Sequence, residues 1–496
     1  MTSAIAPTTT MLINGNRVPA SSGAELPVTD PYLGEDFATI PDAGAPDVDV
    51  AIEAARAAFD GTWRDTPGVQ RAALMHRFAD LLEENAEQIG LLESRDNGKL
   101  VRETTSQARF AARNYRFFAG AADKLSGRTI PMDSIDTFDY TLAEPAGVAA
   151  LITAWNSPMQ LLANKLAPAL AAGNCVVIKP SEHASLSTLA IADLIEQAGF
   201  PAGVINIISG GAAAGAALTS HPGLDRISFT GSVPTGRAIA TAAAQNLVPV
   251  TLELGGKSPN IVFADADLDR AVTGAVAGIF AAGGQTCIAG SRLLVQRAVY
   301  DEVVSAVAKR ADEIRLGDPR DPQTQMGPVA NRPQFERIQA VIAGGLESGA
   351  HAVTTTGPLD GAGLGNGLFV RPTVFGDVSN TSPLAREEIF GPVLSAIPFE
   401  DDEEAIAIAN DSNYGLASGI WTNDLTRAHK VARRLRAGTV WVNTYRASAA
   451  QAPFGGTRQS GYGRERGLEA LQEYLTTKNV MIDLSGKTAD PFSIRT

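Results

Sequence analysis

The chain begins with stretches in which apolar residues recur at three- and four-residue spacing. Residues 48–59 and 71–94 both follow this spacing and carry their charged residues on the other face. A period near 3.6 residues is typical of an amphipathic helix that buries one side. The pattern therefore predicts that the first third of the chain is mostly helical.

From residue 147 onwards, short apolar runs alternate with helix-like segments. These runs are GVAALITAW (147–155), CVVIKP (175–180), GVINIISG (203–210), RISFTG (226–231) and PVTLELGG (249–256). Apolar strands that alternate with helices of about 10–15 residues are typical of βαβ units around a parallel sheet. The same alternation returns after residue 258, so the sequence predicts two α/β units.

Two segments fit neither unit. The polar stretch 126–145 and the C-terminal segment 474–484 could form an extended arm, the kind of element that pairs with another subunit. A chain of 496 residues is long enough for about three domains at about 150 residues each.

Composition narrows the class of partner. A net charge of −13 offers no basic surface for nucleic acid or an anionic membrane. The uncharged stretch Ala271–Ser291 has about the length of a membrane span, but its glycines, Gln285 and Thr286 favour a buried helix that runs into a loop. Two cysteines cannot build a disulfide framework, and the start of the chain shows no secretory pattern. We therefore expect a cytoplasmic protein.

One cysteine, Cys287, lies in the small-residue bend GGQTCIAGSR (283–292). A thiol that packs as a small apolar residue is one interpretation. A reactive thiol is the other, and it requires partial access, an adjacent base and groups that stabilise charge on its target. The second cysteine, Cys175, lies inside a predicted strand and is interpreted as a packing residue.

Two polar side chains lie where such groups are needed. Glu253 stands between two leucines in an apolar run, where burial raises a carboxyl pKa toward that of a general base. A structural ion pair would explain it equally. Asn156, just past the strand 147–153, could donate to an oxyanion, or it could belong to a simple Asn-Ser-Pro turn.

Nucleotide binding is indicated only weakly by local motifs. No G-x-G-x-x-G occurs, and the segments 209–218 and 229–236 could present backbone N–H groups to a phosphate or could be tight turns. In KPSE (179–182), Lys179 and Glu182 could bind a ribose or form a solvated loop. The five histidines make no metal-binding spacing, so no metal is expected.

Taken together, the motifs resemble those of the NAD(P)-dependent aldehyde dehydrogenases over roughly residues 10–485. Glu253 and Cys287 stand 34 positions apart, the interval usual in that family. The matching segments, in order, are AWNSP, KPSE, SFTGS, LELGGKSPNIVF, GGQTCIAGSR, EEIFGPV, NYGLASGIWT, GTVWVN and PFGGTRQSGYGRERG.

The resemblance implies an α/β fold with three parts. They are a Rossmann-like cofactor domain (1–125 and 146–255), an α/β catalytic domain (256–460) and a small β oligomerisation arm (126–145 and 474–490). It also implies a homodimer or homotetramer that acts on a small aldehyde.

The resemblance further implies a covalent mechanism. Cys287 is the nucleophile that forms a thiohemiacetal and then a thioester, and Glu253 is the base that activates the hydrolytic water. Asn156 and the backbone N–H of Cys287 form the oxyanion hole, and Lys165 supports the site. Transfer of the acyl group to coenzyme A is the alternative, which the presence of Glu253 disfavours.

The same resemblance assigns the cofactor contacts. Lys179 and Glu182 hold the adenosine ribose, Ser232 contacts the pyrophosphate, and Glu388 and Phe390 hold the nicotinamide end. Glu182 favours NAD over NADP because its charge would repel a 2′-phosphate, although NADP is possible. The other implied contacts are Ile152, Trp155, Ser181, Gly211, Gly215, Phe229, Thr230, Gly231, Leu254 and Gly255.

The implied substrate pocket is less aromatic than is common in the family. This composition predicts a polar or oxygenated aldehyde as the substrate. Its residues are Ser157, Gln160, Asn164, Thr286, Ile288, Ser448 and Phe454.

Overall fold

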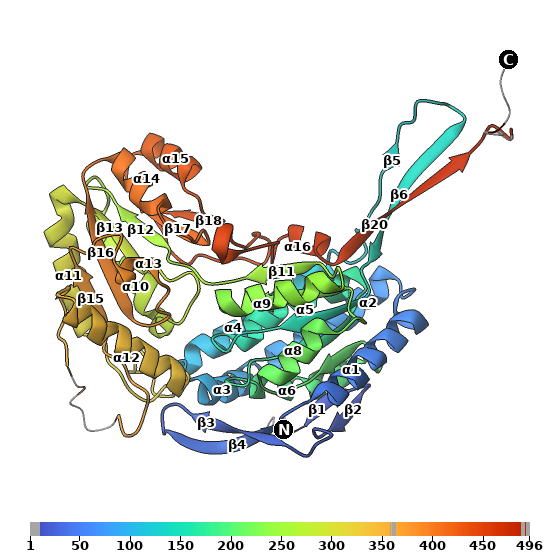
Figure 1. The fold of residues 1–496 in the computed structure, drawn as a ribbon, viewed down its shortest axis with the longest axis horizontal. Helices are drawn as coiled ribbons and strands as arrows, with labels where there is room; N and C mark the ends of the chain where they lie inside the picture. Colours follow the sequence, from blue (N-terminus) through green and yellow to red (C-terminus); the bar gives the residue numbers. More distant parts are fainter. Residues whose placement is uncertain (1–9, 358, 360–363, 488–491, 493–496) are drawn as a thin grey trace.

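A computed structural model describes residues 10–357, 359, 364–487 and 492 of the chain. Residues 1–9 of the expected cofactor domain and residues 488–490 of the expected arm lie outside the described residues. Figure 1 shows two α/β bodies side by side, with a narrow β-arm projecting from one of them.

The first body is built around an eight-stranded sheet of order β19-β11-β10-β7-β8-β9-β1-β2. Strands β11, β10, β7, β8 and β9 run parallel, while β19 and the β1–β2 pair close the two edges in antiparallel fashion. The strands are Met11–Ile13 (β1), Asn16–Val18 (β2), Val148–Ile152 (β7), Cys175–Lys179 (β8), Ile205–Ile207 (β9), Arg226–Thr230 (β10), Val250–Glu253 (β11) and Gly461–Tyr462 (β19).

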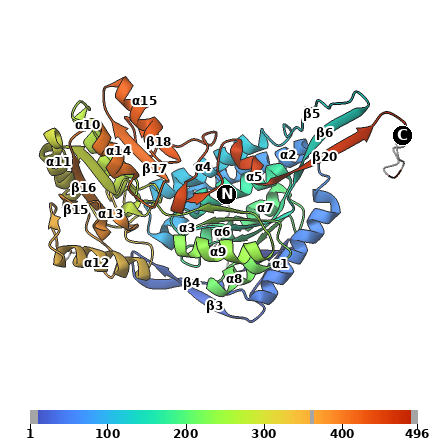
Figure 2. The same cartoon turned by 45° about the horizontal axis from the view of Figure 1, so that its top comes forward.

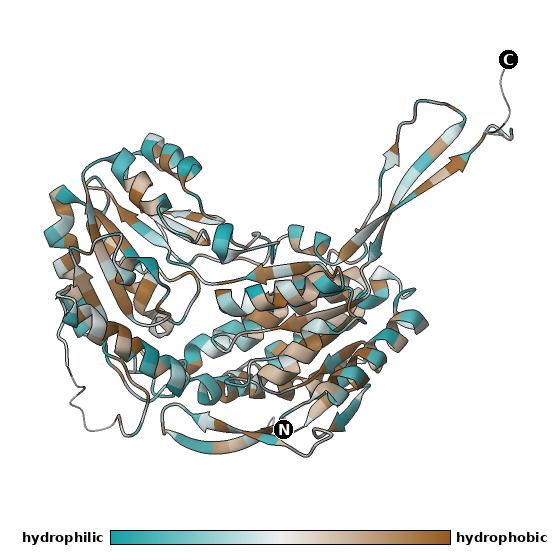
Figure 3. Ribbon diagram, viewed as in Figure 1, coloured by the Kyte–Doolittle hydropathy of each residue, from teal (hydrophilic) through white to brown (hydrophobic). Residues whose placement is uncertain are grey.

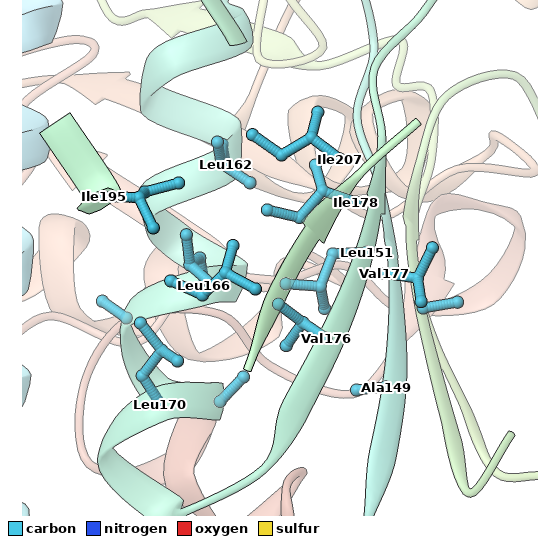
Figure 4. Packing of buried hydrophobic residues seen from close by; sticks show 14 of the residues in the cluster. Ala149, Leu151, Leu162, Leu166, Leu170, Val176, Val177, Ile178, Ile195 and Ile207 are labelled. Atoms are coloured by element: carbon cyan, nitrogen blue, oxygen red, sulfur yellow. The ribbon is translucent and has the colours of Figure 1, made fainter. Parts of the chain in front are cut away.

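Helices cover this sheet and bury apolar faces against it. Figure 4 shows Leu162, Leu166 and Leu170 of one helix, α5, pointing toward Leu151 and Ile178 of the adjacent strands. Their spacing of four residues places them on one side of that helix. The helices of this body are Ala45–Ala58 (α1), Gly68–Glu84 (α2), Ala86–Asn97 (α3), Val101–Ala119 (α4), Pro158–Ala172 (α5), Leu186–Ala190 (α6), Ala192–Ala198 (α7), Ala212–Ser220 (α8), Val233–Gln245 (α9) and Glu469–Gln472 (α16).

The expected helical start of the chain is only partly right. From residue 10 on, where the description begins, four strands precede α1: β1 and β2, then Glu25–Asp30 (β3) and Glu35–Pro41 (β4), which pair with each other. The β1–β2 turn uses Asn14 and Gly15 with φ of 51° and 74°, the left-handed geometry of an Asn-Gly hairpin. Strands of three residues are too short to show a clear two-residue period.

The second body contains a seven-stranded sheet of order β14-β15-β16-β13-β12-β17-β18. Its strands are parallel except for the edge strand β14. The strands are Pro259–Val262 (β12), Arg292–Gln296 (β13), His351–Ala352 (β14), Thr373–Gly376 (β15), Val393–Phe399 (β16), Ala417–Trp421 (β17) and Thr439–Val442 (β18). The helices are Leu268–Phe280 (α10), Tyr300–Asp312 (α11), Arg332–Glu347 (α12), Pro383–Arg386 (α13), Asp402–Asn410 (α14) and Leu425–Arg434 (α15).

The arm is a three-stranded antiparallel sheet of order β20-β6-β5. Thr129–Ile130 (β5) and Thr137–Pro145 (β6) come from the polar stretch, and Leu475–Asp483 (β20) comes from the C-terminal segment. Figures 1 and 2 show it standing away from both bodies. Segments more than 300 residues apart in sequence thus form one element.

Hydropathy follows this architecture. Figure 3 shows apolar strands in the interior of both bodies and polar residues on the outer faces of the helices. The uncharged stretch expected to form a buried helix and a loop does so, with α10 followed by a turn. Among the described residues, no helix is long and apolar enough to cross a membrane.

Candidate active site

The loop that carries Cys287 is shaped by small residues. After α10 the chain makes a tight turn (Ala281–Gly284) in which Gly283 and Gly284 have φ of 61° and 70°. A Cβ on Gly284 would lie 2.1 Å from the carbonyl oxygen of Gly391. Only glycine fits this close approach, which holds the loop against the neighbouring backbone.

The two cysteines have different surroundings. Cys175 is fully buried in β8, as expected for a packing residue, whereas Cys287 is half-buried. Burial, followed by the carboxyl groups of Glu388 and Glu253, raises the pKa of the Cys287 thiol to about 12, and Arg466 opposes that shift. The thiol is therefore protonated in this form and must lose its proton to react.

Asn156 lies close to the loop that carries the thiol. It follows β7, is 8% exposed, and its Nδ2 donates to the backbone oxygen of Gln285 over 3.0 Å. An amide nitrogen carries two hydrogens, so one donor remains for another acceptor. Asn156 and Cys287 line the same pocket.

Glu253 ends β11 in a water-poor environment. The residue is 3% exposed, and neither carboxyl oxygen has a hydrogen-bond partner among the described residues. Burial raises its pKa well above the ordinary value, the nearby Glu465 raises it further, and Lys165 opposes both. A Cβ on Gly455 would lie 2.7 Å from Glu253 Oε1, so glycine there makes room for the carboxyl group.

Lys165 lies near Glu253, in a buried polar cluster. Its ammonium forms an ion pair with Glu465 and donates to Ser228 Oγ over 3.1 Å. Lys165 is fully buried and Glu465 is 3% exposed. The structural ion pair that the sequence left open for Glu253 is therefore made by Glu465 instead.

A pocket opens at Cys287. All seven residues expected to contact the substrate line it. They come from α5 and the residue before it, from the thiol loop and from the segment 446–454. Asn164 accepts a hydrogen bond from Asn114 over 2.7 Å, and Ser157 donates to the backbone oxygen of Asn156 over 2.6 Å. Whether these side chains contact a substrate stays a prediction.

The residues expected to bind the cofactor gather at one edge of the first sheet. They lie at or just beyond the carboxyl ends of β7, β8, β10 and β11 and at the starts of α8 and α9, where ligands of parallel sheets bind. Ser232 caps α9 by accepting from Thr235 N over 3.3 Å. Thr230 Oγ1 is buried without a hydrogen-bond partner among the described residues.

Glu388 and Phe390 approach this edge from the second body. Glu388 Oε1 accepts from Gly256 N over 3.0 Å, and burial raises its pKa to about 7. Its other oxygen would lie 2.0 Å from a Cβ on Gly255, so this glycine is required for the contact. The Phe390 ring packs edge-on against Trp155 at 5.2 Å between centroids.

The KPSE motif and the first glycine-rich segment meet around Lys179. The Lys179 ammonium lies 3.8 Å from Glu182, and Gly211 N donates to Asp42 Oδ1 over 3.0 Å. Burial lowers the Lys179 pKa, while Glu182 and Asp42 oppose that shift. The start of α8 thus already binds one carboxylate through Gly211, and whether this segment also binds a phosphate stays a prediction.

Comparisons with known proteins identify the family of this chain. The family model described as "Aldehyde dehydrogenase family" matches residues 18–480. A (Z)-2-((N-methylformamido)methylene)-5-hydroxybutyrolactone dehydrogenase of Acinetobacter baylyi is 46% identical over 95% of this chain and 97% of its own. A betaine aldehyde dehydrogenase of Cereibacter sphaeroides is 42% identical over 96% and 98%.

Solved structures give the same result. Betaine aldehyde dehydrogenase of Staphylococcus aureus in complex with NAD+ superposes with a TM-score of 0.97 at 37% identity, covering 99% of this chain and 98% of that one. The chain therefore belongs to the aldehyde dehydrogenase family. The expected fold and enzyme class are confirmed.

Some residues near the site were not singled out from the sequence. They include Glu465 and Arg466, although both stand in the matched segment PFGGTRQSGYGRERG. Lys99 and Arg446 line the pocket as well. Charged residues within a loop motif give no local sign of burial, so only the fold reveals their position.

Proposed function

We propose that this chain oxidises an aldehyde to the carboxylic acid with NAD+, with Cys287 as nucleophile and Glu253 as general base. One observation supports this most strongly. Cys287, the half-buried one of the two cysteines, lies with the amide donor Asn156 at one pocket. The buried Glu253 carboxyl group, which has no hydrogen-bond partner among the described residues, contributes to raising the pKa of this thiol. Acyl transfer to coenzyme A is not favoured, because Glu253 supplies the base that hydrolysis needs.

The proposed reaction begins when the Cys287 sulfur attacks the aldehyde carbon and the thiol proton passes to a base. The new C–S bond leaves an oxyanion, which needs donors that are already in place. The free N–H of Asn156 and the backbone N–H of Cys287 are the proposed donors. The raised thiol pKa means that this proton transfer is a step the site must assist.

A bound NAD+ supplies the hydride acceptor that the oxidation requires. The residues present fit such a group, because Thr230, at the carboxyl end of β10, leaves a buried hydroxyl without a hydrogen-bond partner among the described residues. Glu253 then takes a proton from water that attacks the thioester, and the C–S bond breaks to release the acid and the Cys287 thiol.

This function is tested by an aldehyde panel with NAD+ or NADP+, read by reduced-nucleotide absorbance with and without added coenzyme A. We expect turnover with NAD+, and kcat/KM for NADP+ lower by about 10-fold or more, because Glu182 and Asp42 would face the extra phosphate. The Glu182→Gln variant should raise kcat/KM for NADP+, while Glu196→Gln on the exposed side of α7 should not. Equal use of both nucleotides by the wild type would contradict this assignment.

We also propose a cytoplasmic homodimer or homotetramer with the arm as its interface. Both cysteines are unpaired, which suits a reducing compartment. The arm exposes apolar side chains that a monomer would leave in water, among them Ile135 at 96% and Met481 at 62%. Phe138 and Ile482 stand opposite each other across the β6–β20 pair and are also exposed.

Replacing both Phe138 and Ile482 with glutamine should shift the protein to a smaller species in analytical ultracentrifugation. The change removes apolar area without adding charge to the arm. Leu425→Gln is the matched control, because Leu425 is exposed at 73% at the start of α15, on the second body and far from the arm in Figure 1. An unchanged sedimentation coefficient in the double variant would exclude this face as the interface.

A further inference from the structure

The pocket at Cys287 carries a concentrated positive charge. Lys99, Arg446 and Arg466 all line it, and none of the described residues that line it is an aspartate or a glutamate. None of the three forms an ion pair with a carboxylate of the described residues. An uncompensated cluster of cations in a partly closed pocket favours an anionic guest.

Arg466 is held by two contacts, but one of its hydrogen-bond donors lacks an acceptor among the described residues. Its guanidinium donates to Ser448 Oγ and stacks on the Phe454 ring at 4.5 Å. The residue is 7% exposed, yet its Nε has no hydrogen-bond partner among the described residues. A buried N–H without an acceptor is costly unless a ligand completes it.

Arg446 also keeps donors available. Its printed hydrogen bonds run through one nitrogen, Nη1, to the backbone oxygens of Ala281 at 3.1 Å and Ala277 at 3.4 Å, near the end of α10. The residue has φ of 65°, so its backbone sits in a constrained left-handed turn. A guanidinium anchored at one nitrogen can offer its other N–H groups to a carboxylate.

Lys99 adds charge without a close counter-ion. Its ammonium donates to two neutral atoms, Ser157 Oγ at 3.0 Å and Gln107 Oε1 at 3.1 Å. Burial lowers the pKa of both Lys99 and Arg446. The more distant Glu103 opposes that shift in both residues, and Glu93 opposes it in Lys99.

Two acidic residues near Arg466, Glu465 and Glu253, do not neutralise its charge. Burial lowers the pKa of the Arg466 guanidinium, and the carboxyl groups of Glu465 and Glu253 oppose that shift. Glu465 is itself paired with Lys165, and burial raises the pKa of Glu253. Neither carboxyl group lines the pocket, and neither forms an ion pair with Arg466 among the described residues. The pocket therefore retains a net positive character.

We propose that the substrate is an aldehyde that also carries a carboxylate, and that Arg446 and Arg466 recognise that carboxylate. The inference rests on the proposed function, since it places this aldehyde in the pocket of Cys287. Arginine presents paired N–H donors that match a carboxylate, which a neutral or cationic aldehyde lacks. The same charges would disfavour betaine aldehyde, which carries a quaternary ammonium group.

The test compares substrates of matched shape and different charge. Wild-type kcat/KM should be at least about 10-fold higher for para-carboxybenzaldehyde than for para-methylbenzaldehyde, and for succinic semialdehyde than for pentanal, with betaine aldehyde lowest. In the Arg446→Gln, Arg466→Gln double variant, the carboxylate-to-methyl ratio of kcat/KM should fall by about 10-fold or more, to a value near 1. In both single variants the ratio should fall by less.

Arg433→Gln is the matched control, because Arg433 is exposed on α15, and its ratio should equal that of the wild type. Arg446→Lys and Arg466→Lys keep the charge and test whether the paired N–H donors of arginine are needed. Thermal unfolding checks that every variant is folded. Equal wild-type use of the matched pairs would overturn the proposal. So would a double variant that loses both substrates in proportion, because the arginines would then serve the thiolate or the fold. Turnover of neither substrate would instead reject the proposed dehydrogenase function.

Discussion

Replacing Cys287 with serine should reduce steady-state NADH formation by about 10⁴-fold or more, because a hydroxyl is a far weaker nucleophile than a thiol near neutral pH. NAD+ binding should persist, since the residues expected to hold the nucleotide lie at the strand ends of the first body. Steady-state kinetics measures the first effect, and calorimetry of NAD+ binding measures the second. Retained turnover in the serine variant would remove Cys287 as the nucleophile.

The other cysteine provides the control for that experiment. Cys175→Ala leaves a small cavity in β8 and should lower stability while retaining the catalytic rate. Iodoacetamide should label Cys287 alone in the folded enzyme. Because the thiol pKa is raised to about 12, its thiolate fraction, and with it the labelling rate, should keep rising with pH through the mildly alkaline range.

Much of the fold could be predicted from local pattern. The alternation of buried strands with amphipathic helices indicated both parallel sheets, because strands buried on both faces read as continuous apolar runs. The arm segments stood out for the opposite reason, since they are polar and fit neither body. The β1–β2 hairpin was missed although Asn14 and Gly15 mark its turn, because each of its strands has only three residues.

The candidate site was predictable to the extent that its residues follow strand ends. Asn156, Lys179 and Glu253 each follow or end a parallel strand, and such ends meet at one edge of a sheet. The ion pair of Lys165 with Glu465 joins residues 300 positions apart, so no local pattern could reveal it. The contact of Asp42 with Gly211 spans 169 positions and was missed for the same reason.

The charge of the pocket shows the same limit more sharply. The residues at the matched positions predicted a polar substrate pocket, and Ser157 and Ser448 line the pocket at Cys287. No local pattern places Arg446 and Arg466 at one cavity, because net charge is a property of the whole chain. A protein with a net charge of −13 can still present a cationic pocket, since the fold decides which charges meet.

Glu253→Gln should separate the two halves of the reaction. The variant should still release a burst of NADH of about one equivalent per site, and its steady-state rate should then fall by about 10³-fold, the size of a lost general base. The amide keeps nearly the shape of the carboxyl group in a position that Gly455 leaves open, so the pocket should stay intact. It cannot accept a proton from water, and the thioester on Cys287 should accumulate. Stopped-flow absorbance measures the burst, and mass spectrometry of the quenched protein detects the acyl adduct.

The surroundings of Glu253 determine how its pH profile should change. Burial and Glu465 raise its pKa, so in the wild type the deprotonated base increases as pH rises and hydrolysis should accelerate with it. That dependence should disappear from the slow phase of the glutamine variant. Glu336→Gln, an exposed change on α12, should behave as wild type. If Glu253→Gln gave neither burst nor turnover, the carboxyl group would be required to deprotonate the Cys287 thiol, and its proposed role would move from the second half of the reaction to the first.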